Sequence, residues 1–247
     1  MMNDQKSCVV IGNFDGIHLG HDKLIKDMLS ISKKNSLKPV ILTFKFSDDS
    51  LKKNAQRMKY ITSFNKKMEL LRKRYRCRVE AIDLDSEICK MSPTEFVKNI
   101  LSKKLNAANI VVGFDFRFGY KASGSVRELY DFEDIYGYKL YVMNAVKYHG
   151  VKISSSLIRE AIKNGEIKTV NKLLVGNYTI YNNRISKLTA GKYLLQKDVE
   201  ILYPKDGKYN VSVCGLAVEI RIETVENDTY IYTNNEELGC DLVFIEY

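Results

Sequence analysis

The sequence has no apolar run long enough to cross a bilayer, and its first residues do not have the layout of a signal peptide. A membrane-spanning helix needs about 18 or more consecutive apolar residues. The 247 residues also contain no internal repeat and no low-complexity segment. We therefore expect a folded cytoplasmic protein without a membrane partner, whose 45% apolar content is enough for a true hydrophobic core.

Cysteine is present but lacks any pairing pattern. The five residues are scattered along the chain without a CxxC spacing: Cys8, Cys77, Cys89, Cys214 and Cys240. An odd number without a pattern is typical of free thiols in a reducing compartment. We therefore expect no disulfide and no metal ligand among the cysteines.

The charge is unevenly distributed along the chain. Residues 177–247 hold seven basic and eleven acidic side chains, whereas residues 1–176 hold 32 basic and 19 acidic ones. The strongly basic first part suits an anionic ligand, either a nucleic acid or the phosphates of a nucleotide.

The hydrophobic pattern up to Gly176 predicts alternating strands and helices. Ser92, Pro93 and Glu95 form a helix-start signal, and Gly137 and Gly165 are helix-end signals. This alternation is typical of a parallel sheet with right-handed crossovers. Strands are predicted at 7–12, 38–44, 78–85, 109–115 and 139–146, and helices at 21–34, 63–75, 92–105, 124–137, 154–165 and 166–176.

The composition changes after Gly176 to segments rich in Tyr, Val, Ile and Thr with period-two alternation. We therefore predict an α/β domain at 1–176, with a Rossmann-like doubly wound parallel sheet. A smaller all-β, barrel-like domain is predicted at 177–247. The polar stretch 45–60 is expected to be a loop near the end of a strand.

The stretch GNFDGIHLGH, residues 12–21, follows the first predicted strand and opens the first helix. It holds two of the three histidines of the chain, His18 and His21. In doubly wound sheets this position binds ligands, and the helix N-terminus offers N–H groups and a positive dipole end to phosphate. Imidazoles beside a triphosphate can stabilise charge that develops during nucleotidyl transfer. The alternative is a glycine-rich turn with incidental histidines.

Two later segments have a similar setting. VVGFDFRFG, residues 111–119, ends a predicted strand and alternates aromatic with charged side chains, which suits a flavin ring and its polar edges. Its phenylalanines are equally compatible with a core position. KISSSLIR, residues 152–159, combines hydroxyls with a helix start and an arginine, and so suits phosphate or simply caps a helix.

Together these segments resemble bacterial FAD synthetases, the adenylyltransferase part of the bifunctional riboflavin kinase/FAD synthetase family. GNFDGIHLGH resembles the G-x-F-D-G-x-H-x-G-H motif of that family, and the segments at 42–44, 111–119 and 152–176 follow in the family's order. The resemblance covers about residues 7–180. It implies an FMN adenylyltransferase, which converts ATP and FMN into FAD and pyrophosphate, with Mg²⁺ bound to ATP.

The resemblance also implies roles for individual residues, and no protein ligand for a metal. The expected catalytic residues are His18, His21 and Arg159. ATP is expected to contact Gly12, Asn13, Phe14, Asp15, Gly20, Ser154, Ser155 and Ser156. The flavin is expected to contact Asp115, Phe116, Arg117 and Phe118.

The chain departs from the bifunctional pattern in its C-terminal part. PKDGKYNVSV, residues 204–213, resembles a hairpin of the kinase barrel, but the P-T-A-N element of the kinase ATP site is missing. We therefore expect no riboflavin kinase activity. Two alternatives remain: a bifunctional enzyme, and a non-catalytic flavin or nucleotide sensor or RNA-binding module. Too few aromatics lie among the basic clusters for an RNA platform, so no nucleic acid is expected as a partner. The sequence does not define the oligomeric state.

Overall fold

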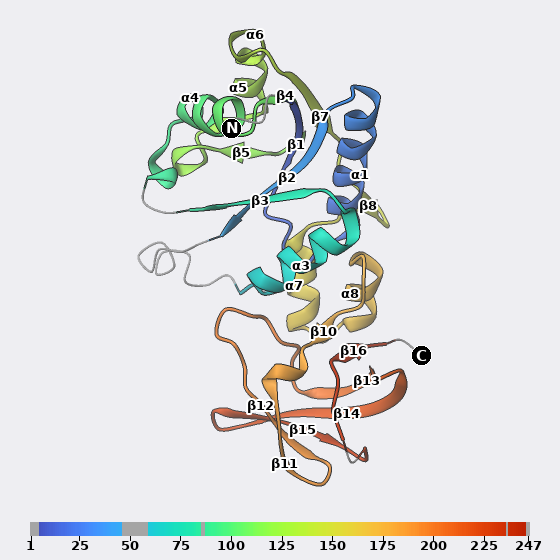
Figure 1. Ribbon diagram of the computed structural model, residues 1–247. Coiled ribbons are helices and arrows are strands. Elements are labelled where there is room, and N and C mark those ends of the chain that lie inside the picture. The colour runs from blue at the N-terminus through green and yellow to red at the C-terminus, as the bar shows by residue number, and fades with distance from the viewer. Residues whose placement is uncertain (1–4, 46–58, 85–86, 236, 246–247) are drawn as a thin grey trace. The chain divides into compact units, whose positions relative to one another are not determined.

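The computed structural model describes residues 5–45, 59–84, 87–235 and 237–245. The chain forms two units, which Figure 1 shows in colours that follow the sequence. Unit 1 comprises Met1–Phe14, Gly20–Met58 and Phe64–Lys152, and unit 2 comprises Asp15–Leu19, Lys59–Ser63 and Ile153–Tyr247. The boundary at 176/177 stays a prediction, because a unit defined by packing need not coincide with a domain. Most of the loop predicted at 45–60 lies outside the described residues.

Unit 1 is built on a five-stranded parallel sheet with the strand order β3-β2-β1-β4-β7. β1 is buried at every position, as expected for a strand that is covered on both faces. The strand order reverses between β1 and β4, and this is the switch point of a doubly wound sheet. The strands are β1 (Ser7–Ile11), β2 (Lys38–Lys45), β3 (Arg78–Asp83), β4 (Ala107–Gly113) and β7 (Lys139–Met143).

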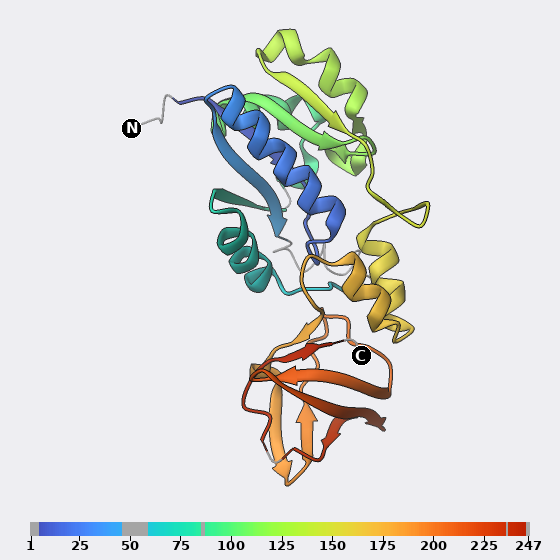
Figure 2. The same ribbon diagram turned by 90° about the vertical axis from the view of Figure 1, so that its right-hand side faces the viewer.

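Helices cover both faces of this sheet (Figures 1 and 2). α1 (Leu19–Lys34) lies along one face, where the Cys8 thiol of β1 approaches the Met28 carbonyl at 3.7 Å. Burial raises the pKa of the Cys8 thiol to about 12, so this thiol is inert. The other helical elements of unit 1 are α3 (Phe64–Tyr75), η1 (Ile88–Lys90), α4 (Pro93–Glu95), η2 (Phe96–Lys104), η3 (Tyr120–Ala122), α5 (Val126–Asp131) and α6 (Glu133–Tyr136).

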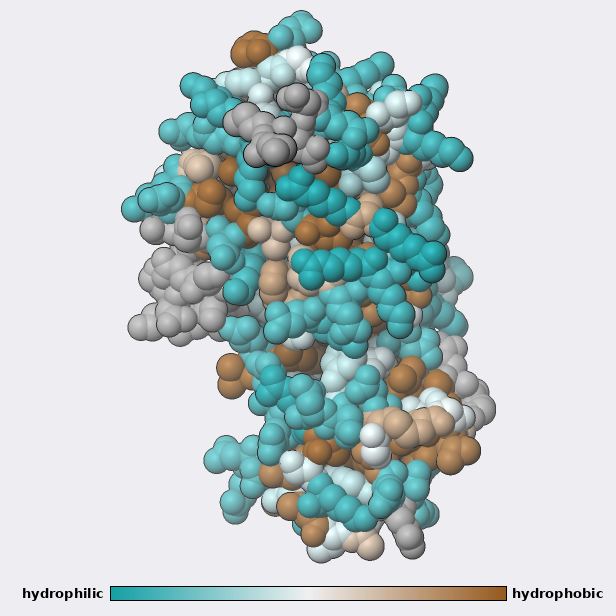
Figure 3. All heavy atoms as spheres, in the orientation of Figure 1, coloured by the Kyte–Doolittle hydropathy of each residue, from teal (hydrophilic) through white to brown (hydrophobic). Residues whose placement is uncertain are grey.

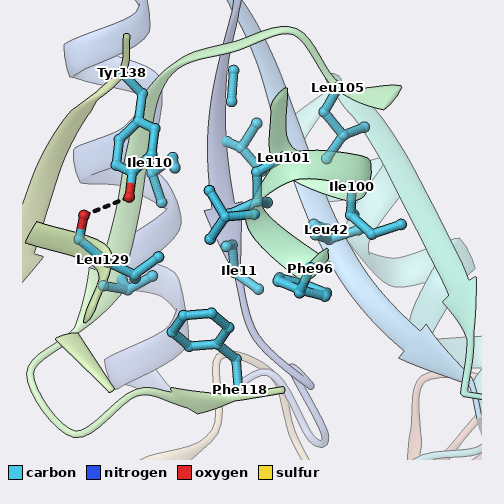
Figure 4. Packing of buried hydrophobic residues seen from close by; sticks show 14 of the residues in the cluster. Ile11, Leu42, Phe96, Ile100, Leu101, Leu105, Ile110, Phe118, Leu129 and Tyr138 are labelled. Atoms are coloured by element: carbon cyan, nitrogen blue, oxygen red, sulfur yellow. Dashed lines mark hydrogen bonds between the residues drawn. The ribbon is translucent and has the colours of Figure 1, made fainter. Parts of the chain in front are cut away.

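The core on the opposite face packs η2 and α5 against the sheet (Figure 4). Alternate strand residues such as Ile11 and Leu42 point into it, as the two-residue period of a strand requires. Phe96 and Leu101 of η2 fill the space above them. The Tyr138 hydroxyl donates a hydrogen bond to the Leu129 carbonyl, so the polar end of this buried ring has a partner.

Local capping signals place the helix ends in unit 1. Ser92 and Glu95 form the predicted capping box, with Pro93 in the first helical position. Gly137 ends α6 in the left-handed conformation, with φ of 67°. These predicted helix boundaries are therefore confirmed.

Unit 2 combines two helices with a seven-stranded antiparallel sheet of order β10-β16-β13-β14-β15-β12-β11. The sheet curls like part of a barrel (Figure 1), so the predicted fold class, α/β with a second barrel-like part, is confirmed. The elements are α7 (Ser155–Lys163), α8 (Ile167–Leu173), β10 (Thr179–Ile180), η4 (Asn182–Arg184), β11 (Ile185–Thr189), β12 (Lys192–Leu195), β13 (Gly207–Val213), β14 (Leu216–Val225), β15 (Asp228–Thr233) and β16 (Leu242–Phe244). Two short hairpins complete unit 1: β5 (Arg117–Phe118) with β6 (Gly124–Ser125), and β8 (Lys147–Tyr148) with β9 (Val151–Lys152).

The prediction that all five cysteines are free is wrong, because Cys214 and Cys240 form a disulfide with a Cα–Cα distance of 5.6 Å. Cys214 and Gly215 form the tight turn between β13 and β14, with φ of 49° and 87°. The antiparallel pairing of β13 with β16 brings this turn close to the segment before β16. No local pattern indicated this pairing, since 26 positions separate the two residues.

Hydrophilic side chains make up most of the face that Figure 3 shows. Among the described residues, no helix combines the length and the apolar character that crossing a bilayer requires.

Candidate active site

The loop after β1 has an unusual backbone. Phe14 and Ile17 have positive φ of 54° and 41°, in the left-handed region that is costly for bulky and β-branched residues. Gly16 has φ of 77°, and a Cβ atom there would lie 2.9 Å from the Ile61 side chain. At Gly12 a Cβ would lie 2.9 Å from the tip of the Phe14 ring, so a larger residue there would force this buried ring to shift. Strained backbone of this kind is concentrated at functional sites.

His18 and His21 flank the start of α1. His18 directly precedes the helix and is 5% exposed, and His21 lies in its first turn together with Gly20. The edge of the completely buried Phe14 ring packs against the His21 imidazole, with 5.2 Å between the ring centroids. Phe14 therefore packs against His21, and its ring is not accessible from the surface.

Asn13 belongs to a polar cluster in unit 1 that the sequence did not predict. The Lys67 ammonium, from α3, donates to the Asn13 carbonyl at 2.8 Å and to its side-chain oxygen at 3.2 Å. The Thr43 hydroxyl of β2 donates to the same carbonyl at 3.0 Å. Nothing in the sequence around Lys67 distinguishes it from the other basic residues of this helix.

Asp15 ties three segments of unit 2 together. Its carboxylate accepts hydrogen bonds from the Ile61 N–H at 3.0 Å and the Thr62 N–H at 3.2 Å. The Arg159 guanidinium donates to it at 2.8 Å, and both side chains are buried. Burial raises the pKa of the neighbouring Tyr60 hydroxyl, and the negative charge of Asp15 raises it further. A carboxylate held by this many donors orients the loop around it.

The three predicted serines lie at the start of α7, and one of them contacts Asp15. The Ser154 hydroxyl caps α7 by accepting from the Leu157 N–H at 3.2 Å. The Ser155 hydroxyl donates to the Asp15 carbonyl at 3.0 Å, while Ser156 is exposed. The Arg159 Nε is buried and has no hydrogen-bond partner among the residues that the structure describes. The Nε–H donor of this guanidinium is thus not used in its pairing with Asp15.

The segment 15–19 is also pinned to the end of α8. The Val175 N–H donates to the Ile17 carbonyl at 3.1 Å, and His18 forms a β-bridge with Leu174. These contacts fix the position of the backbone at His18.

The predicted flavin segment follows β4, on the other side of the switch point from β1. Phe114 is 49% exposed, and the Lys152 ammonium lies 4.9 Å from the centroid of its ring while it pairs with the Asp115 carboxylate. Lys152 was not predicted, because it lies 37 positions away in the sequence. The Arg117 side chain donates to the Ala122 carbonyl at 3.1 Å and is exposed.

Phe116 and Phe118 lie at different depths. Phe118 is only 6% exposed and belongs to the core, in contact with Phe96. Phe116 is half-buried and stacks on Phe118, with 5.6 Å between centroids and 11° between the ring planes. Of these two rings, Phe116 is therefore the one whose face is accessible to a ligand.

No group of three or more His, Cys, Asp or Glu side chains within the described ranges is arranged to hold a metal ion.

Comparison with known proteins identifies the family. The family model for FAD synthetase matches residues 1–157, which include the loop after β1 and the segment after β4. This chain belongs to the FAD synthetase family. The predicted family and the predicted enzyme class, a nucleotidyltransferase, are thereby confirmed.

Related FAD synthetases are found among curated bacterial proteins named bifunctional riboflavin kinase/FMN adenylyltransferase. The protein of Buchnera aphidicola from Schizaphis graminum is 32% identical over 190 residues, which are 74% of this chain and 61% of that protein. The protein of Buchnera aphidicola from Acyrthosiphon pisum is 31% identical, over 97% of this chain and 82% of that protein. The protein of Listeria monocytogenes is 29% identical, over 84% and 68%. The chain thus matches less than two thirds of the length of the first of these relatives.

A solved structure shares the fold of this FAD synthetase family member. The crystal structure titled macrolide-efflux protein from Streptococcus pneumoniae has a TM-score of 0.81 and 22% sequence identity, and covers 99% of this chain and 86% of that one. At this identity the likeness concerns the fold alone.

Proposed function

We propose that this chain transfers the adenylyl group of ATP to FMN. An oxygen of the FMN phosphate attacks the α-phosphorus of ATP in line, the bond from that phosphorus to the bridging oxygen breaks, and pyrophosphate leaves with FAD as the product. No covalent enzyme intermediate is needed, so catalysis rests on positioning and charge stabilisation. The observation that carries the proposal is the strained, glycine-dependent loop that ends in His18 and His21 at the start of α1, in a chain of the FAD synthetase family.

In unit 1, His21 is proposed to donate a hydrogen bond to triphosphate oxygens that gain charge in the transition state. Gly12 and Gly20 let the backbone approach the nucleotide, and Asn13 contributes a polar side chain. Phe14 acts indirectly, through the edge contact that orients His21.

In unit 2, His18 is proposed to act on the triphosphate as His21 does. Ser155 and Arg159 are proposed to grip the β- and γ-phosphates, with Ser154 and Ser156 beside them at the N-terminus of α7. Asp15 is proposed to orient Arg159, which the 2.8 Å ion pair supports.

The flavin is proposed to meet the segment after β4. Phe116 offers the ring face, and Phe118 supports that ring from the core. Asp115 and Arg117 would contact the polar edges of the flavin. Lys152 joins them as an additional candidate, because it pairs with Asp115.

Mg²⁺ is proposed to arrive bound to ATP, as part of the substrate. The residues proposed here are hydrogen-bond donors and hydroxyls, which suit the phosphate oxygens of a magnesium–nucleotide complex. Because ATP and FMN are intracellular metabolites, we propose the cytoplasm as the place of action, with no membrane or nucleic-acid partner.

The division into a transferase domain at 1–176 and a β domain at 177–247 is part of the proposal. The β domain lacks the P-T-A-N element in its sequence, so we propose that it does not phosphorylate riboflavin.

The test is an incubation of the purified protein with ATP, Mg²⁺ and either FMN or riboflavin, followed by chromatographic separation of the flavins. We expect FAD from FMN and no product from riboflavin. If no FAD forms from FMN, the proposed reaction is wrong and a binding protein becomes the better hypothesis. If FMN forms from riboflavin, the β domain is a kinase.

A further inference from the structure

A buried lysine lies beneath the loop that follows β1. The Lys67 side chain comes from α3 and is only 4% exposed. Lysine is almost never fully buried without strong partners, because an ammonium loses much hydration free energy in the protein interior. Its neighbours on the same helix, Lys66 and Lys73, do not share this burial. The position therefore requires an explanation beyond a charged helix surface.

Four oxygen atoms of the described residues lie within hydrogen-bond distance of the Lys67 ammonium. Two belong to Asn13, at 2.8 Å for the carbonyl and 3.2 Å for the side-chain oxygen. The others are the Thr43 hydroxyl at 3.0 Å and the Phe44 carbonyl at 3.1 Å, both at the end of β2. The Phe64 ring lies on a further side, with its centroid 5.3 Å from the ammonium. Lys67 thus joins the end of β2 to the first polar residue after β1.

This arrangement determines how Asn13 faces its surroundings. An ammonium has only donors, so it can bind the oxygen of the Asn13 amide and not the nitrogen. With its oxygen held by Lys67, the amide of Asn13 donates through Nδ2. Phosphate oxygens are acceptors, so a donor in this orientation is what a triphosphate needs.

We propose that Lys67 is a positioning residue of the adenylyl-transfer site, which fixes the Asn13 amide as a hydrogen-bond donor to the nucleotide. The inference rests on the proposed function, because it assigns a partner to the site described there. Lys67 acts through Asn13 and does not itself touch ATP.

A double-mutant cycle tests this indirect action. Lys67→Met removes the ammonium but keeps an apolar stem of similar length, and Asn13→Ala removes the amide. We expect each single variant to weaken ATP binding, measured by calorimetry, and kcat/KM for FAD formation by about tenfold or more. In the Asn13→Ala background, Lys67→Met should change both values less than about twofold, because residues that act as a unit are not additive.

Two further variants keep the test decisive. Lys73→Met, on an exposed position of the same helix, should leave affinity and kcat/KM within about twofold of the wild type. If Lys67→Met does not fold, Thr43→Val replaces it, since it removes a hydroxyl that contacts both Lys67 and Asn13. Thr43→Val should lower ATP affinity and kcat/KM less than Lys67→Met does, and this effect should likewise disappear in the Asn13→Ala background.

The outcomes separate the two proposals. If the wild type makes no FAD, the proposed function fails, and the ATP affinities alone then decide whether Lys67 works through Asn13. If the wild type makes FAD but the effects of Lys67→Met and Asn13→Ala simply add, Lys67 does not position Asn13 and the inference is overturned. Wild-type affinity and kcat/KM in Lys67→Met would overturn it as well.

Discussion

His21 is the residue whose removal should affect the chemistry most directly. His21→Ala removes a donor to charge that develops on the triphosphate, so kcat should fall by about two orders of magnitude or more. The steady-state rate of FAD formation measures this. Thermal unfolding should change little, because His21 is only half-buried.

The third histidine of the chain provides the matched control. His149 is exposed in the turn between β8 and β9, and His149→Ala should retain wild-type turnover. Near-normal turnover in His21→Ala would remove the imidazole from the mechanism.

Asp15 should be required for stability as well as for the site. Asp15→Asn leaves the Arg159 charge buried without its carboxylate partner, which costs about 3–5 kcal/mol in comparable pairs. The free energy of unfolding in urea measures the loss, without any ligand present. The double variant Asp15→Asn/Arg159→Met should have a higher free energy of unfolding than Asp15→Asn alone, because it removes the buried charge that lost its partner.

An exposed ion pair of the same unit calibrates this result. Lys208 and Glu219 are paired at 3.3 Å, with most of each side chain in solvent. Lys208→Met should shift the free energy of unfolding by less than about 0.5 kcal/mol. An effect of Asp15→Asn as small as that would mean that the hydrogen bonds and the ion pair of Asp15 are not required for stability.

Sequence patterns were informative for residues whose role depends on their immediate neighbours in the chain. The glycine-rich stretch after β1 was expected either to bind phosphate or to form a turn, and the structure shows a tight loop there, with a positive φ at Gly16 and the Phe14 ring close to Gly12. Lys67 and Lys152 could not be predicted, since their partners are brought to them by the tertiary fold. The depth of Phe118 in the core was equally open, because an alternating aromatic pattern does not say how far each ring is buried.

At the scale of elements, Asp22 links α1 to α3. Its carboxylate accepts from Tyr75 at 2.9 Å and Arg74 at 3.1 Å, and it pairs with Lys26 at 2.6 Å. Burial alone would raise the pKa of Asp22, but these three donors outweigh it and lower the pKa below its usual value. Because the pKa is lower in the folded state, the stabilisation is complete above about pH 4 and is lost as pH falls through the folded pKa.

Asp22→Asn should therefore lower the free energy of unfolding by about 2 kcal/mol near neutral pH. Denaturant unfolding from about pH 6 to about pH 3 should show the difference from the wild type shrinking as pH falls. Asp27→Asn, in the pair with the exposed Lys23 on the same helix, should cost less than about 0.5 kcal/mol. A difference for Asp22→Asn that does not change with pH would contradict the charge-based link.

Elements were predictable where local signals agreed with the hydrophobic period. The strands of the parallel sheet are β-branched runs, and the capping residues around Pro93 and at Gly137 mark helix ends. The disulfide between Cys214 and Cys240 escaped prediction, because it depends on which strands become neighbours and not on spacing.

At the scale of the whole molecule, the excess of basic residues in 1–176 should attract two anionic substrates. We expect kcat/KM for ATP to fall several-fold as ionic strength rises from about 0.01 M to about 1 M, since the Debye length shrinks from about 30 Å to about 3 Å. The loss should appear in KM and leave kcat nearly unchanged. Sodium chloride and potassium acetate at equal ionic strength distinguish screening from competition by a specific anion, and a KM independent of salt would refute the attraction.

The path of the backbone has a consequence for engineering. The chain passes between the two units five times, because Asp15–Leu19 and Lys59–Ser63 belong to the same unit as Ile153–Tyr247. No single cut in the gene releases either unit whole, because a truncation near residue 176 removes the β-sheet of one unit but leaves its residues 153–176 and its two short inserts behind. The C-terminal part shares a unit with the segment that carries His18, so a substitution in either one can disturb the packing of the other.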